Sequence, residues 1–544
     1  MTQKKLTTHP QLKTPSGPVV LIIMDGIGIG KSDQSNAIHL AKTPFLDTIY
    51  NMPLYTTLKA HGNAVGMPSD DDMGNSEVGH NTLGAGRIFD QGAKLVQNAI
   101  KSKSLFKGKT WKALIKNTKT HNSTLHFIGL LSDGNVHSHI NHLKDMISEA
   151  NKINITKIRL HILLDGRDVG ERTALHYIND IETHLSQFNI NKYDYKIASG
   201  GGRMITTMDR YNADWRIVER GWHAHVLGKG PQFQSASDAV SDAYKKSSTL
   251  IDQYIPPFVI TQNHQPVGPI CDNDSVIFQN FRGDRAIEIT QAFENDTFSH
   301  FDRIRRPNIM YAGMLQYDGD LKLPTHYLVK PPHIELPIST YLCHSNIKSF
   351  AISETQKFGH VTYFWNGNNS GYINKNLETY IEIPSDTIPF DQAPKMKAVE
   401  ITNKTIELLQ SGNYQFGRIN FPNGDMVGHT GVMDAVIKSV EITDQCVQKI
   451  VETVNNLNGI TVVLADHGNA DEMFTIDKNG NKQNKTSHTL NPVPCIIIDP
   501  NHNNNYKLNS SIKTPGLANI ASTLCNLLGF TSPKDYEDSL ITPS

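Results

Sequence analysis

Short β-branched apolar runs that end in Asp, Gly, Asn or Arg recur along the chain, and they constrain its fold more than any other feature. They occur at 19–26, 125–134, 158–168, 196–203, 275–285, 308–320, 417–425 and 460–469. Such runs are typical of strands buried on both faces of a parallel sheet. Helix-like stretches lie between them, at 136–152, 205–222 and 431–457. The alternation predicts an α/β fold with doubly wound sheets.

Length, charge and cysteine content limit the class of protein. A chain of 544 residues exceeds what one hydrophobic core usually supports, so we expect two domains. The 52 basic and 53 acidic side chains balance, which gives no indication of a nucleic-acid or membrane partner. The run "VVLIIM" is too short to cross a bilayer, and the five cysteines include no CxxC pair. We expect a cytoplasmic protein that is a monomer and acts on a small molecule.

Carboxylates and imidazoles follow several of the predicted strands, where ligands bind in open α/β sheets. They are Asp25 in "MDGIG", Asp425 and His429 in "PNGDMVGHTG", Asp466 and His467 in "LADHGNADE", and His488 in "KTSHTLNPVP". Each alone reads as an ordinary turn, cap or core residue. Together, without thiolates, they suit Mn²⁺ or Mg²⁺ and can also take Co²⁺ or Zn²⁺. Six ligands suffice for two ions, which at about 3.5–4 Å separation can clamp an in-line phosphoryl transfer.

One serine, Ser76, lies in the glycine-rich stretch "DDMGNSEVGHNTLGAGR" at 71–87. An isolated serine in such a polar stretch is usually a surface-loop residue. The glycines, however, let a ligand approach the backbone closely. A nearby divalent cation lowers the pKa of a hydroxyl and makes it a nucleophile without a histidine base. The residues therefore lead to the hypothesis that Ser76 is the nucleophile of a two-metal site.

Arginines follow the strands predicted in the middle of the chain. They are Arg167 beside Asp168 in "DGRD", Arg203 in "GGGR", Arg210 in "MDR", and Arg282 and Arg285 in "FRGDR". Any one could be an exposed ion-pair partner worth roughly 0–1 kcal/mol. Five at corresponding strand edges indicate one anion pocket, because guanidinium binds carboxylate and phosphate bidentately. We expect Asp168 to stay ionised among these cations.

Histidines are closely spaced in "VHSHINH", which contains His137, His139 and His142. Such spacing is a known zinc-ligand pattern, although histidines at a helix start are more often exposed to solvent. The residues alone leave both interpretations open.

Four motifs in order, "MGNSEVGH", "NFPNGDMVGHTG", "LADHGNADE" and "SHTLNPVP", resemble the 2,3-bisphosphoglycerate-independent phosphoglycerate mutases of the alkaline phosphatase superfamily. The resemblance runs from "LIIMDGIG" to 486–494. It implies an isomerase of glycolysis and gluconeogenesis that interconverts 3-phosphoglycerate and 2-phosphoglycerate through a phosphoserine intermediate. The stretches "SGGGRMITTMDRYNADW" and "SETQKFGHVTYFWNGNNSGY" look more like the plant and nematode branch than the shorter bacterial one.

The resemblance also implies roles for individual residues. One metal ion would be held by Asp425, His429 and His488, and the other by Asp25, Ser76, Asp466 and His467. Ser76 would carry the phosphoryl group and Lys357 would contact it. His137 and the five arginines would bind the substrate, and Asp168 would be the acid and base. Six residues separate Arg203 from Arg210, one more than in the shorter branch, so Arg210 is the less direct match.

The ligand positions also predict the domain organisation. A discontinuous metal-binding, alkaline-phosphatase-like domain would comprise 1–89 and 333–544, with an inserted α/β substrate domain at 90–332. The stretch "LVKPPHIELP" at 328–337 is a plausible linker. A metal-dependent phosphatase or a phosphopentomutase could share the metal residues. The arginine series and the motifs "DGRDVGERT" and "FQNFRGDRA" favour the glycerate enzyme, and an inactive relative would be expected to lack a ligand or the serine.

Overall fold

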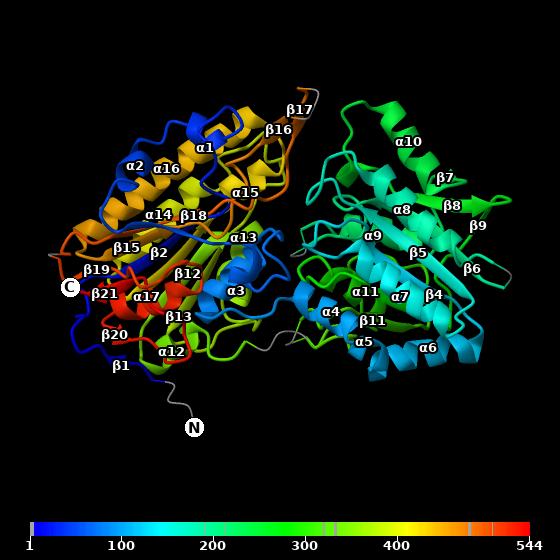
Figure 1. The fold of residues 1–544 in the computed structure, drawn as a ribbon, viewed down its shortest axis with the longest axis horizontal. Helices are drawn as coiled ribbons and strands as arrows, with labels where there is room; N and C mark the ends of the chain where they lie inside the picture. The colour runs from blue at the N-terminus through cyan, green and yellow to red at the C-terminus, as the bar shows by residue number, and fades with distance from the viewer. Residues whose placement is uncertain are drawn as a thin grey trace. The chain divides into compact units, whose positions relative to one another are not determined.

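The computed structural model describes residues 5–190, 192–210, 213–318, 321–330, 334–476, 480–502 and 504–544. The chain forms two compact units (Figure 1). Unit 1 is Met1–Gln91 with His333–Ser544, and unit 2 is Gly92–Pro332. Part of the linker predicted at 328–337, residues 331–333, lies outside the described residues, as does the predicted boundary between 332 and 333.

Unit 1 is built on a seven-stranded sheet of order β13-β12-β14-β2-β15-β18-β3. The strands are β2 Val19–Met24, β3 Tyr55–Leu58, β12 Ser349–Glu354, β13 Glu378–Ile383, β14 Phe416–Phe421, β15 Ile460–Leu464 and β18 Val493–Ile498. The first five in spatial order are parallel, whereas β18 and β3 are antiparallel to their neighbours. Every residue of the central strand β2 is fully buried, which explains its unbroken apolar sequence.

Helices cover both faces of this sheet, with α14 and α16 on one side and α12 and α17 on the other (Figure 1). The helices of unit 1 are α1 Ala37–Leu40, α2 Pro44–Ile49, η1 Gly62–Val65, α3 Ser76–Ala85, α12 Ile338–His344, α13 Thr355–Gly359, η3 His360–Phe364, α14 Ala398–Gln410, α15 Asn423–Gly428, α16 Met433–Asn456 and α17 Asn519–Leu527. The small strand pairs are β1 Thr7–Thr8 with β20 Phe530–Thr531, β16 Phe474–Ile476 with β17 Lys482–Asn484, and β19 Tyr506–Leu508 with β21 Ile541–Pro543.

Unit 2 has a sheet of order β11-β10-β4-β5-β6-β8-β7, with β9 paired to β8. Its strands are β4 Leu125–Leu130, β5 Lys157–Leu164, β6 Asp194–Gly202, β7 Gln232–Phe233, β8 Phe258–Gln262, β9 Gln265–Pro266, β10 Ser275–Phe278 and β11 Met310–Gly313. The strands from β11 to β6 are parallel, and β8 is antiparallel to β6. Its helices are α4 Gly92–Lys101, α5 Ser104–Lys107, α6 Lys109–His121, α7 Ile140–Lys152, α8 Ala174–Ser186, α9 Trp215–His225, α10 Ala236–Lys246, η2 Asp252–Tyr254 and α11 Ile287–Glu294.

The predicted α/β fold is confirmed, and each predicted strand run contains a strand: β2, β4, β5, β6, β10, β11, β14 and β15. The helix predicted at 431–457 forms as α16. The helix predicted at 205–222 is wrong in its first half, because α9 begins only at Trp215. Thr207 has φ +72°, which a right-handed helix excludes, while residues 211 and 212 lie outside the described residues. The helix predicted at 136–152 likewise begins later, at Ile140, with His139 as its N-cap.

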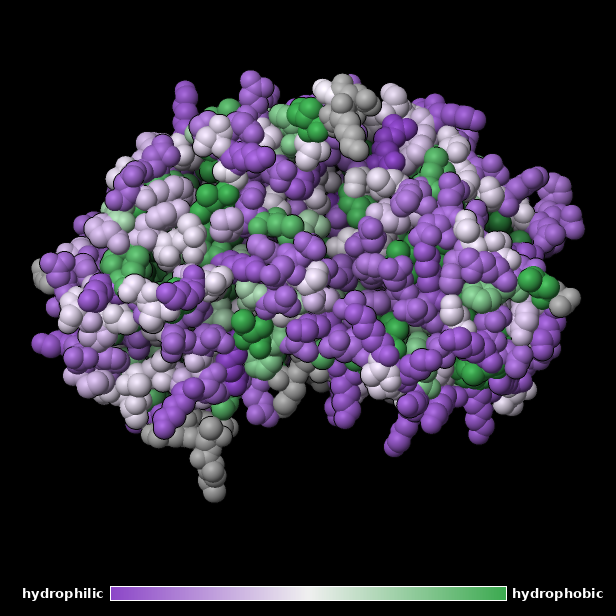
Figure 2. All heavy atoms as spheres, viewed as in Figure 1, coloured by the Kyte–Doolittle hydropathy of each residue, from purple (hydrophilic) through white to green (hydrophobic). Residues whose placement is uncertain are grey.

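The face shown in Figure 2 is predominantly hydrophilic, with small hydrophobic patches between hydrophilic side chains. In the described part of the chain, no helix is both long and apolar enough to cross a bilayer. The five cysteines are all free.

Candidate metal centre and anion pocket

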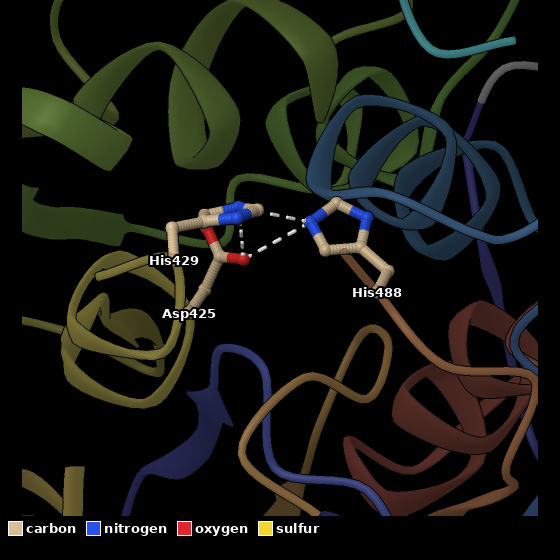
Figure 3. A group of neighbouring side chains, drawn as sticks. All are labelled: Asp425, His429 and His488. Carbon is tan, nitrogen blue, oxygen red and sulfur yellow. Dashed lines mark hydrogen bonds and ion pairs between the residues drawn. The ribbon is translucent and has the colours of Figure 1, made fainter. Parts of the chain in front are cut away.

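Asp425, His429 and His488 meet at one point beside the sheet of unit 1 (Figure 3). Asp425 lies in α15, directly after β14, and His429 ends that helix. His488 comes from the loop before β18. The Oδ1 atom of Asp425 is 3.0 Å from His429 Nε2 and 3.1 Å from His488 Nε2, and the two Nε2 atoms are 3.2 Å apart. The three side chains are nearly fully buried.

The tautomers of these two histidines follow from their outer contacts. His429 Nδ1 lies 2.6 Å from the carbonyl oxygen of Thr486, and His488 Nδ1 lies 2.8 Å from that of Gly74. Because a carbonyl can only accept, each ring carries a proton on Nδ1 and turns Nε2 toward the shared point. The lone pairs of the two Nε2 atoms and the Oδ1 atom of Asp425 therefore face one another at 3.0–3.2 Å. Such electron-rich atoms repel one another unless a positive charge lies between them. This donor set fits a divalent cation.

Asp25, Asp466 and His467 form a second group, at the ends of β2 and β15. His467 Nε2 is 3.2 Å from Asp25 Oδ1 and 3.8 Å from Asp466 Oδ2. Asp466 is fully buried, and within the described residues neither of its oxygens has a well-formed hydrogen bond. Burial lowers the pKa of His467, but Asp466, Asp25 and Asp425 outweigh it and raise the pKa to about 9. This second group therefore also attracts a cation.

Ser76 and Lys357 lie between the two groups. Ser76 is the first residue of α3, and its Oγ is 3.2 Å from Asp25 Oδ1 and 3.0 Å from His467 Nε2. Lys357, on α13, donates to Ser76 Oγ, to Asp25 Oδ1 at 2.9 Å and to Asp425 Oδ2 at 2.7 Å. Burial raises the pKa of Asp425, but its close contacts with His429, Lys357 and His488 hold the pKa well below its ordinary value. The hydroxyl is thus held between carboxylates, an imidazole and an ammonium group.

The location of Ser76 at a helix start also favours negative charge on its side chain. Asn75 caps α3 by accepting a hydrogen bond from the amide of Val78 at 3.2 Å. The N-terminal end of the helix dipole stabilises an anion there. A phosphoryl group on this serine would benefit from that field.

Five buried arginines gather beyond the strands of unit 2, and none is more than 7% exposed. Arg203, directly after β6, donates to Asp165 Oδ1 at 2.8 Å and also pairs with Asp168. Arg210 lies 3.4 Å from Asp284 Oδ2, and Arg282 lies 3.0 Å from Asp284 Oδ1. The other two arginines are Arg167 and Arg285.

The electrostatics show that these arginines share one site. Burial together with Arg210, Arg203 and Arg167 lowers the pKa of Arg285 well below its ordinary value. Burial and four of the same arginines likewise lower the pKa of His137, so its imidazole is neutral. The five guanidinium groups outnumber the three buried carboxylates that accompany them, Asp165, Asp168 and Asp284. The pocket is therefore suited to an anionic ligand.

Comparison with known proteins decides the family. A profile of the metalloenzyme superfamily matches residues 17–532. A Leptospira interrogans protein named "Probable 2,3-bisphosphoglycerate-independent phosphoglycerate mutase" is 54% identical over 97% of both chains. The mutase of Trypanosoma brucei brucei is 47% identical over 98% of this chain and 99% of its own.

This chain belongs to the 2,3-bisphosphoglycerate-independent phosphoglycerate mutase family. The resemblance drawn from four motifs is thereby confirmed. Among solved structures, a Leishmania mexicana phosphoglycerate mutase studied at low cobalt concentration matches this family member with a TM-score of 0.96 and 47% identity. The match covers 99% of this chain and 100% of that one. Family membership supports divalent metal binding by this chain, and the two buried ligand groups of unit 1 are candidate sites for it.

Several residues of this mutase-family site escaped the sequence analysis. His80 Nδ1 donates to the Ser76 carbonyl at 2.8 Å and lies 3.3 Å from Asp466 Oδ2. Asn420 donates to Asp25 Oδ2 at 2.8 Å, and Asn469 donates to Asp425 Oδ1 at 3.2 Å. The spacing of His80, one helical turn after Ser76, is a signal that could have found it. Asp165 and Asp284 were missed in the arginine pocket although they lie inside the quoted motifs.

The histidine cluster at 137–142 does not make a metal site among the described residues. His137 lies in the arginine pocket, with Nδ1 3.8 Å from Asp284 Oδ1. His139 accepts a hydrogen bond from the amide of Asn141 and caps α7. His142 packs against Phe281. The three rings therefore serve different purposes, and the zinc interpretation finds no support.

Proposed function

We propose that this chain is an isomerase that interconverts 3-phosphoglycerate and 2-phosphoglycerate without bisphosphoglycerate, in glycolysis and gluconeogenesis. The observation that carries the proposal is the buried Ser76 hydroxyl between two metal-ligand groups, in a chain of this family. The five buried arginines of unit 2 fit a phosphate substrate. We further propose that unit 1 corresponds to the metal-binding domain at 1–89 and 333–544, and unit 2 to the substrate domain at 90–332.

In this proposal Ser76 Oγ attacks phosphorus, so that the bond from phosphorus to the glycerate oxygen breaks as the bond to Oγ forms. Asp425, His429 and His488 would hold one divalent ion, and Asp25, Ser76, Asp466 and His467 the other, with Mn²⁺ or Mg²⁺ preferred and Co²⁺ or Zn²⁺ also accommodated. Such ions lower the pKa of the hydroxyl and neutralise charge that develops on the phosphoryl oxygens. Lys357 adds a positive charge at the same place and would contact the transferring group.

The arginine pocket would hold the glycerate part. Arg167, Arg203, Arg210, Arg282, Arg285 and His137 would bind its carboxylate and hydroxyls. Asp168, ionised beside Arg203, would take the proton from the glycerate hydroxyl that carries no phosphate and pass it to the glycerate oxygen that leaves phosphorus. The oxygen that lost its proton would then attack the phosphoserine, and Ser76 would both react and be released as its deprotonated oxygen. The proton and the phosphoryl group therefore exchange positions, and the enzyme returns to its starting state.

A metal-dependent phosphatase would use the same residues of unit 1. The five buried arginines of unit 2 support a mutase, because hydrolysis does not require that the dephosphorylated product be retained. No observation favours a phosphopentomutase.

The test is formation of 2-phosphoglycerate from 3-phosphoglycerate in a coupled assay with no bisphosphoglycerate added. We expect activity that disappears when a chelator removes the metal and returns when Mn²⁺ or Mg²⁺ is added back. Activity that survives complete metal removal would exclude the two-metal mechanism. Release of inorganic phosphate as the main product would identify a phosphatase instead.

A further inference from the structure

A continuous chain of buried side chains connects three strands and one helix of unit 2. Figure 1 shows three of its elements, β4, β5 and β6, side by side in the sheet. Its members are at most 4% exposed, and the proposed chemistry uses none of them. In order they are Asp274, His126 on β4, His161 on β5, Ser199 on β6, His225 at the end of α9, and Thr207; we call this chain the relay.

Each link of the relay is a hydrogen bond. Asp274 Oδ2 is 3.0 Å from His126 Nε2, and His126 Nδ1 is 2.9 Å from His161 Nε2. His161 Nδ1 is 2.7 Å from Ser199 Oγ, which is 2.7 Å from His225 Nδ1. His225 Nε2 is 2.9 Å from Thr207 Oγ1.

The carboxylate at one end sets the direction of every bond. Asp274 also accepts from the amides of Thr124 and Cys271, so it is held as an acceptor, and His126 must donate from Nε2. His126 Nδ1 then accepts from His161, His161 accepts from Ser199, and Ser199 accepts from His225. His225 Nε2 is left as the acceptor for the Thr207 hydroxyl. Burial lowers the pKa of all three imidazoles, that of His225 to about 3, which keeps the rings neutral.

The other end of the relay lies in the loop 203–210, between two arginines of the pocket. Thr207 has φ +72°, a left-handed conformation that a β-branched residue rarely adopts. The loop lies directly on α9, since a Cβ on Gly221 would come within 2.0 Å of Thr207 Oγ1. The next carbonyl, that of Met208, accepts from Arg285 Nη1 at 2.6 Å. The position of Thr207 therefore affects three of the five arginines.

We propose that the relay is a positioning device that holds the loop 203–210 in the conformation in which its arginines bind the anionic substrate. The identity of that substrate rests on the proposed function. The left-handed conformation of Thr207 is unfavourable by itself, and the hydrogen bond from its hydroxyl to His225 helps to compensate for it. Without that acceptor the loop populates other conformations, and the apparent affinity for substrate falls in proportion to the competent fraction.

The test compares three substitutions in one loop. Thr207→Val keeps the shape of the side chain but removes the donor to His225. Thr207→Ser keeps the hydroxyl. Thr206→Val is the matched control, because the buried Thr206 hydroxyl has no hydrogen-bond partner among the described residues. We expect Thr207→Val to raise KM about tenfold with kcat within about threefold, and the other two to stay within about twofold of the parent.

A second variant acts in the middle of the relay. Ser199→Ala removes two of its links and should also raise KM. Because both substitutions interrupt one chain, the effect of the double variant should be clearly smaller than the product of the single effects. Thermal unfolding of each variant separates loss of folded protein from loss of affinity. Independent, multiplicative effects, or a KM that stays unchanged in both single variants, would overturn the proposal.

Two measurements do not depend on activity. Hydrogen exchange of peptides covering 203–210 should accelerate in Thr207→Val and Ser199→Ala but not in Thr206→Val. Nitrogen NMR of histidine-labelled protein should show His225 protonated on Nδ1, and His126 and His161 protonated on Nε2. If the chain showed no mutase activity, these results would still support the relay. Unchanged exchange, or the opposite tautomer at His225, would contradict it even in an active mutase.

Discussion

Ser76 is the residue on which the proposed chemistry depends most directly. Its hydroxyl contacts Asp25, His467 and Lys357, while the other ligands also contact one another. We predict that Ser76→Ala folds and retains bound metal but turns over negligibly, because only the nucleophile is removed. Metal content, circular dichroism and the coupled assay test this. Substantial remaining mutase activity would assign the nucleophile elsewhere.

Asp168 lies among positive charges, so its replacement should separate binding from catalysis. Asp168→Asn removes a negative charge next to Arg203, which leaves the pocket more attractive to an anion. We expect substrate affinity to be kept or increased while kcat falls by about 10²–10⁴, the usual contribution of a positioned acid or base. Titration calorimetry and steady-state kinetics measure the two effects. Weakened binding with intact turnover would show that Asp168 only orients an arginine.

At the scale of secondary structure, α3 positions the serine because it packs unusually closely on its neighbours. A Cβ on Gly84 would come within 2.0 Å of the carbonyl oxygen of Trp365, at the end of η3. A Cβ on Gly79 would lie 3.0 Å from the Cβ of Asp466. Glycine at both positions lets the helix that begins at Ser76 approach the metal ligands.

We therefore predict that Gly84→Ala destabilises the protein by about 1–3 kcal/mol, despite the better helix propensity of alanine, because overpacking must displace α3. Lys449→Ala, at an exposed position of α16, is the matched control and should be nearly neutral. Chemical denaturation of both variants measures the difference. If the Gly84→Ala variant is as stable as the parent, α3 and the Trp365 carbonyl can move apart without a measurable loss of stability.

At the scale of the whole molecule, the distinction between mutase and phosphatase depends on retention of the glycerate. A held hydroxyl acts at an effective concentration that can reach about 10⁵ M, far above the roughly 55 M of water. A mixture of 3-phosphoglycerate labelled in the phosphoryl oxygens and 3-phosphoglycerate labelled in carbon should therefore give 2-phosphoglycerate with little exchange between the labels. Mass spectrometry of the product measures this. Extensive exchange would show that glycerate leaves in each cycle.

The same experiment tests the arginine pocket. Arg282→Ala should weaken the hold on glycerate, so that label exchange and phosphate release both increase relative to the parent. Arg306→Ala, at a surface ion pair with Asp296, provides the control. If Arg282→Ala only raises KM and phosphate release stays negligible, retention depends on the exclusion of water rather than on this arginine.

Sequence alone determined the strand runs, the α/β class and the residues that the structure gathers into two candidate metal-ligand groups. These properties are local: an apolar β-branched run such as 19–24 must be buried, and a polar residue such as Asp25 or Asp466 that follows a buried strand lies at the carboxyl edge of the sheet. The prediction of a metal site needed only one further assumption, that several of these strands end at the same edge of one sheet.

Tertiary structure decided what depends on strand order and loop path. His126, His161 and Ser199 form a relay only because β4, β5 and β6 are adjacent, and no local pattern specifies that order. Thr207 adopts a left-handed backbone conformation although the sequence around it predicts a helix. Its contacts with α9 outweigh the local preference for right-handed backbone angles. Asn420 faces Asp25 for the same reason, since β14 pairs with β2 across nearly 400 residues of sequence. Contacts between distant segments arise from packing of the whole chain, which short-range periodicity does not encode.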